Sequence, residues 1–91
     1  MQKWSQDQAV AFECARECIV DLMGICSAEL ADLDGVVDVC ATHAERIEQR
    51  LAALAAELRR LHVTDTAHIE RIRLDYGQEV RAYRARPITP A

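Results

Sequence analysis

Two pairs of residues have the types and the spacing that could bind a metal ion. Cys14 and Cys18 are four residues apart, and Cys40 and His43 are three residues apart. On a helix, residues three or four apart lie on the same face. Thiolate and imidazole groups are ligands that Zn²⁺ prefers in tetrahedral sites. These four side chains are therefore the candidate metal ligands of the chain.

The first of these pairs also resembles a motif of known metal-storing proteins. The Cys-x-x-x-Cys spacing of Cys14 and Cys18, with Cys26 farther along, resembles one helix of the cysteine-rich helical bundles that store copper. Those bundles repeat the motif on every helix, whereas this chain holds one copy. Cys26 and Cys40 also fall at predicted core positions, where a reduced thiol packs as a small apolar side chain. We therefore expect structural cysteines and no cofactor, with a Cys/His metal-binding bundle as an alternative.

An arginine-rich segment near the C-terminus is the second chemical candidate. Seven arginines lie within residues 59–86, and two tyrosines lie among them. Such a strip could contact phosphates and stack bases. Glu70, Asp75 and Glu79 are interleaved with the arginines, which favours a solvated face with paired charges. Nucleic-acid contact by this segment is therefore an alternative function and not the preferred one.

Catalytic motifs are absent from the sequence. No serine, cysteine or histidine has the flanking turn that activates a nucleophile, and there is no glycine-rich phosphate loop. The acidic residues are spread along helix surfaces instead of being paired in a cleft. His62 and His68 flank a predicted helix break, and we expect both side chains to be solvated. The sequence thus predicts a protein that is not an enzyme.

A regular apolar pattern from Val37 to Leu61 predicts the element around which the fold is built. Its apolar residues recur at intervals of three and four, which is typical of a helix packed along other helices. No glycine or proline interrupts it. The pattern consists of Val37, Cys40, Ala44, Ile47, Leu51, Leu54, Leu58 and Leu61.

A first helix is predicted over residues 5–33. Ser5 and Gln8 have the spacing of a capping box, in which each side chain bonds the other residue's backbone amide. Gly35 suits the turn that follows, so the first two helices should form an antiparallel hairpin. Gly24 lies in the middle of the first helix, where it marks a close approach, a slight bend or a tolerated substitution. The core stripe of this helix consists of Phe12, Ala15, Ile19, Leu22, Met23, Cys26, Leu30 and Leu33.

The apolar pattern loses phase after Leu61, which leaves two interpretations open. Either the chain breaks at residues 62–66, with Thr64 or Asp65 capping a third helix, or one long helix continues through a stutter. The β-branched and capping residues in that stretch favour the break. The predicted helices then span residues 5–33, 36–61 and 65–85, within one domain at 1–86. Prolines at 87 and 90 predict a disordered tail over residues 87–91.

Composition and charge limit the class and the location of the protein. Half of the residues are apolar but few are aromatic, as in helix-on-helix packing. No apolar stretch suits a signal peptide or a membrane span, so we expect a cytoplasmic protein. Abundant arginine and alanine suggest a bacterial source. Residues 1–58 hold four basic and eleven acidic side chains (net −7), and residues 59–91 hold seven basic and four acidic (net +3). This asymmetry favours antiparallel docking of the last segment on the first, or of two copies on each other.

Together these patterns predict an all-α protein that acts by protein–protein association. We expect an antiparallel hairpin plus a C-terminal third helix, assembled as a homodimeric helical bundle with no membrane contact. The protein should be an adaptor, or an inhibitor of a host protein of the phage or mobile-element accessory type. The predicted core seam is Phe12, Ile19, Cys26, Leu30, Cys40, Ile47, Leu51, Leu54, Leu58 and Leu61. The predicted partner surface is Val10, Cys14, Ile25, Arg81, Tyr83 and Arg84.

Overall fold

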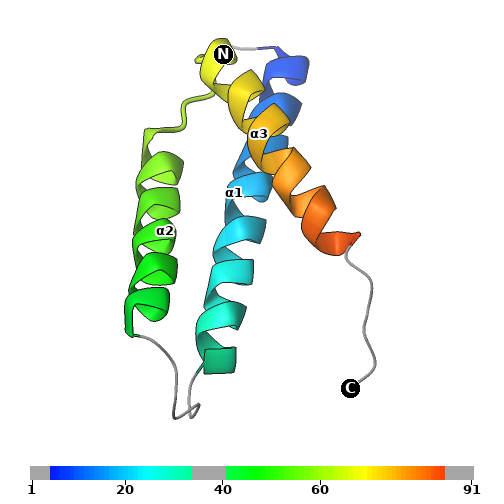
Figure 1. The fold of residues 1–91 in the computed structure, drawn as a ribbon. Coiled ribbons are helices and arrows are strands. Elements are labelled where there is room, and N and C mark those ends of the chain that lie inside the picture. Colours follow the sequence, from blue (N-terminus) through cyan, green and yellow to red (C-terminus); the bar gives the residue numbers. More distant parts are fainter. Residues whose placement is uncertain (1–4, 34–40, 86–91) are drawn as a thin grey trace.

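The computed structural model describes residues 5–33 and 41–85, which form three helices (Figure 1). They are α1 (Gln6–Leu33), α2 (Ala41–Arg60) and α3 (Thr66–Arg84). The described residues contain no strand, and the predicted all-α class is confirmed. The hairpin turn, the predicted start of the second helix, Cys40 and the predicted disordered tail lie outside the described residues.

The first helix begins at the predicted capping box. The Ser5 amide donates to Gln8 Oε1 at 2.9 Å, and the Gln8 amide donates to Ser5 Oγ at 3.1 Å. These bonds satisfy backbone donors that have no partner inside the helix. Asp7 lies in the first turn, where its negative charge is favourable to the helix dipole.

A break separates α2 from α3, as the first of the two interpretations predicted. The α2 helix ends at Arg60, and the backbone turns over residues 61–65. Asp65 then caps α3, because its carboxylate accepts a bond of 3.2 Å from the His68 amide. One continuous helix with a stutter is therefore excluded.

The α1 helix lies between the other two helices and packs against both (Figure 1). The α2 helix runs antiparallel to α1, which gives the predicted hairpin. The α3 helix runs in the same general direction as α1, since Cys18 lies beside Gly77 and Asp21 beside Arg84. The predicted antiparallel docking of the last segment on the first is therefore wrong. Two successive reversals of the chain impose a parallel α3, and the charge asymmetry cannot change that connectivity.

The apolar core gathers along α1 from all three helices. Ile19 and Leu54 are the largest fully buried side chains, at 0% and 1% exposed. Among the predicted seam residues, Phe12, Leu30, Leu51 and Leu58 are partly buried against this core. The buried set is Ala15, Ile19, Leu22, Cys26, Ile47, Leu54, Leu61, Ile69, Ile72 and Val80.

Gly24 occupies an exposed position in α1 with open space around it. A Cβ atom built there has no neighbour within 4 Å, so the glycine does not serve a close approach. We predict that Gly24→Ala raises the free energy of unfolding by about 0.5–1 kcal/mol, because alanine restricts the unfolded chain and favours the helix. Urea denaturation followed by circular dichroism measures this gain. Unchanged or reduced stability would show that the backbone at this position is not an ordinary helix.

Candidate docking groove

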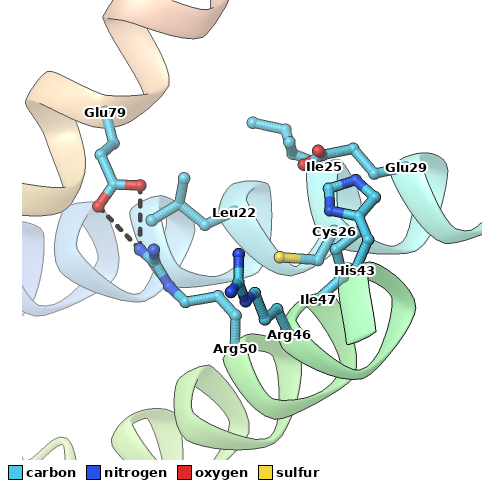
Figure 2. Close-up of a pocket in the computed structure, with 9 residues that line it drawn as sticks. All are labelled: Leu22, Ile25, Cys26, Glu29, His43, Arg46, Ile47, Arg50 and Glu79. Carbon is cyan, nitrogen blue, oxygen red and sulfur yellow. Dashed lines mark hydrogen bonds and ion pairs between the residues drawn. The ribbon is translucent and has the colours of Figure 1, made fainter. Parts of the chain in front are cut away.

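An open groove lies where α1 faces both α2 and α3. No backbone segment of α2 packs against α3, so α1 is covered on two sides but the three helices do not close into a compact bundle. The resulting groove has a volume of about 430 Å³. It is lined by Leu22, Ile25, Cys26, Glu29, His43, Arg46, Ile47, Arg50 and Glu79 (Figure 2).

The floor of this groove is apolar. Leu22, Cys26 and Ile47 are buried, and Ile25 is half-buried beside them. Burial raises the pKa of the Cys26 thiol, which therefore stays neutral and packs as an apolar group. Ile25, which the sequence analysis assigns to the partner surface, packs in part against the core at this groove. A wheel drawn for α1 alone shows no groove there, because the groove depends on where α2 and α3 lie.

One end of the groove is closed by a bridge between α2 and α3. Nη2 of Arg50 donates to both carboxylate oxygens of Glu79, at 2.8 and 2.9 Å (Figure 2). The guanidinium also lies 5.9 Å from the centroid of the Tyr76 ring, within cation–π range. The hydrogen bond to Glu79 raises the pKa of Arg50, so the bridge keeps its charge. This contact joins the two helices across α1.

The remaining rim of the groove carries charges of both signs. Glu29 comes from α1, and His43 and Arg46 come from α2; all three are exposed (Figure 2). An apolar floor with a charged rim suits the apolar stripe of an amphipathic helix, whose flanking polar side chains meet the rim.

A second polar cluster joins the end of α2 to the start of α3. The Glu57 carboxylate bonds Nε2 of His68 and the guanidinium of Arg60. The side chains of Glu57 and His68 are only 14% and 11% exposed. The bond with His68, and then the contact with Arg60, lowers the pKa of Glu57. The expectation that His68 is solvated is therefore wrong, because the break folds α3 back until His68 reaches Glu57.

The candidate metal ligands lie in separate places. Cys14 and Cys18 line a groove between α1 and α3, whereas His43 lines the groove between α1 and α2. Within residues 5–33 and 41–85, no three His, Cys, Asp or Glu side chains gather as a metal site would require. Burial, and then Asp21, raises the pKa of Cys18, which disfavours the thiolate that binds metal. Metal binding stays a prediction.

Ion pairs interrupt the arginine-rich strip. Arg73 pairs with Glu70 at 3.4 Å, and Arg84 pairs with Asp21 of α1 at 3.1 Å. Tyr76 is half-buried against the core. The free positive charge that nucleic acids require is thereby reduced. Nucleic-acid contact also stays a prediction.

Ile25 lies apart from the other residues of the predicted partner surface, because it lines the docking groove beside α2. Val10 is 55% exposed, and Tyr83 is 36% exposed on α3. Cys14 and Arg81 line the same groove between α1 and α3, while Arg84 holds the Asp21 ion pair. Sequence reasoning missed Leu74, which is 60% exposed. The available signal was that Leu74 falls outside the apolar stripe formed by Ile69, Ile72, Tyr76 and Val80.

Two further findings bear on function. Among the described helices, none combines the length and the apolar character that crossing a membrane requires. Comparison with protein-family models, curated proteins and solved structures finds no match to this chain. The function therefore has to be inferred from the surface of the molecule.

Proposed function

We propose that this protein is a small, non-enzymatic cytoplasmic protein that acts by binding another protein. The partner places an amphipathic helix in the groove between α1 and α2. A single observation carries this proposal: a groove lies open beside α1 and α2, and its floor is made of the apolar side chains of Leu22, Ile25, Cys26 and Ile47. An opening of that kind accepts a further helix by the same packing that joins α1 to α2.

The groove also indicates which kind of helix would bind. Apolar side chains spaced at i, i+3, i+4 and i+7 would contact the floor. Acidic flanking residues would face Arg46 and His43 on α2, and a basic residue would face Glu29 on α1. The Arg50–Glu79 bridge would limit how far such a helix extends toward α3.

The test is a comparison of two variants in cells of the source organism. Ile25→Asp places a charge in the groove floor, whereas Val20→Asp places one at an α1 residue that does not line the groove. Affinity-tagged wild type and Val20→Asp should recover the same partner, and Ile25→Asp should recover at least about tenfold less of it. Circular dichroism checks that each variant is folded. Equal recovery by Ile25→Asp would contradict the proposal.

The identity of the recovered protein separates an adaptor from an inhibitor. An inhibitor of the phage or mobile-element type would capture a host nucleic-acid-handling or defence protein and lower its activity in a purified assay. An adaptor would leave the activity of its partner unchanged while joining it to a second protein. Ile25→Asp should abolish either effect, because both depend on the same groove.

A further inference from the structure

A second surface, formed by α1 and α3 alone, is separate from the docking groove. A shallow groove of about 400 Å³ runs between these two helices. Cys14 and Cys18 from α1 and Gly77 from α3 line it, and a Cβ atom built on Gly77 would lie 3.8 Å from the Cys18 sulfur. We call the surface around this groove the α1–α3 face. No residue of α2 contributes to the groove.

Two large apolar side chains are exposed on the α1–α3 face. Leu74 lines the groove from α3 and is 60% exposed. Val10 lies one helical turn before Cys14 and is 55% exposed. They are the two most exposed large apolar residues of the described chain, and they come from opposite sides of the groove.

The two sides of the α1–α3 face carry opposite charge. On α1, Glu17 and Asp21 lie three and seven residues beyond Cys14, on the same side of the helix. On α3, Arg73, Arg81 and Arg84 lie along the groove or beside it. The Asp21–Arg84 and Glu70–Arg73 pairs use four of the charges within one chain. Glu17 and Arg81 are exposed and have no ion-pair partner among the described residues.

Charges arranged in this way are complementary to a second copy of the same face. The α1 and α3 helices cross but run in the same general direction (Figure 1), so a two-fold axis along that shared direction places α1 of one copy against α3 of the other. Glu17 and Arg81 lie at the same level along the helices. Glu17 directly precedes Cys18, whose sulfur lies beside Gly77, and the Arg81 guanidinium also lies beside Gly77. We propose that two copies of this chain dimerise through the α1–α3 face, with Glu17 of each copy paired to Arg81 of the other.

This dimer would leave both docking grooves open, so the assembly would present two identical sites to its partners. Two sites on one assembly raise the apparent affinity for a partner that itself has two copies. The dimer would add a second copy of this chain to the proposed association with another protein. The dimer contact and the docking groove use different residues. Either proposal can therefore fail while the other holds.

Exchange of the two charges tests the dimer. Sedimentation equilibrium of the reduced protein at about 200 µM should show a dimer for the wild type. Glu17→Arg alone, and Arg81→Glu alone, should each weaken dimerisation by at least about tenfold, since like charges then face each other twice. An equimolar mixture of the two variants should form a mixed dimer, because each altered charge again faces its opposite. The double variant should also dimerise.

Two controls separate this geometry from a general effect of charge. Asp75→Arg reverses an exposed charge on α3 away from the groove and should leave dimerisation unchanged. Circular dichroism confirms that all variants are folded. A monomeric wild type, single variants that dimerise like the wild type, or a mixture that stays monomeric would each overturn the proposal. None of these results would change the outcome of the Ile25→Asp experiment.

Discussion

Replacing Ile19 by alanine should lower the free energy of unfolding by about 3 kcal/mol, within the 2–5 kcal/mol found for such core truncations. Ile19 is fully buried on the one helix that packs against both others, so the cavity would affect both contacts of α1. Since a domain of this size has roughly 5–10 kcal/mol of stability, the loss is a large share of the total. Urea denaturation at one fixed protein concentration measures it.

The neighbouring residue provides a matched control. Val20 is also β-branched and lies in the same helix, but it is 42% exposed. Val20→Ala should change the free energy of unfolding by no more than about 0.5 kcal/mol. If Ile19→Ala and Val20→Ala lowered the free energy of unfolding equally, Ile19 would not lie on the buried face of α1.

Replacing Glu57 by glutamine should have the second largest effect, about 1.5–2 kcal/mol at pH 7. The carboxylate accepts charge-assisted bonds across the break between α2 and α3, and its side chain is only 14% exposed. Glutamine keeps the shape but loses the charge that Arg60 and His68 contact. Glu48→Gln, at an exposed position of the same helix, should cost no more than about 0.5 kcal/mol.

The effect of Glu57 should depend on pH in a definite direction. Its pKa in the folded protein is lowered from the ordinary value of 4.5, so the folded state binds this proton less readily than the unfolded state does. The stabilisation is therefore complete above about pH 4.5 and is lost as pH falls through the lowered pKa. The difference in stability between wild type and Glu57→Gln should shrink as pH falls below about 4.5. A difference that grows as pH falls below about 4.5 would contradict the stabilisation by the Glu57 carboxylate.

The parts of the fold that depend on local chemistry could be predicted from the sequence. Ser5 and Gln8 form the capping box that their spacing requires, and Asp65 caps α3 after the break. The core positions Ile19 and Leu54 follow from apolar residues at intervals of three and four. In each case the determining residues lie within a few turns of one another along the chain.

The parts that depend on the placement of α3 could not be predicted. Charge asymmetry suggested that the last segment docks antiparallel, but the connectivity of three helices sets its direction. Ile25 lines the docking groove, and His68 bonds Glu57, only because of where α2 and α3 lie relative to α1. Helical periodicity identifies the apolar face of one helix but does not tell which part of that face a neighbour leaves open.

Site-specific photo-crosslinking tests most directly whether the groove binds a protein. Benzoylphenylalanine placed at Glu29, on the groove rim, should crosslink in the source cells to one defined protein other than this chain (Figure 2). The same group at Val20 should give no such product, and Ile25→Asp should suppress the product formed from position 29. Crosslinking of the same protein from Val20 with equal yield, or no product from position 29, would contradict docking in the groove between α1 and α2.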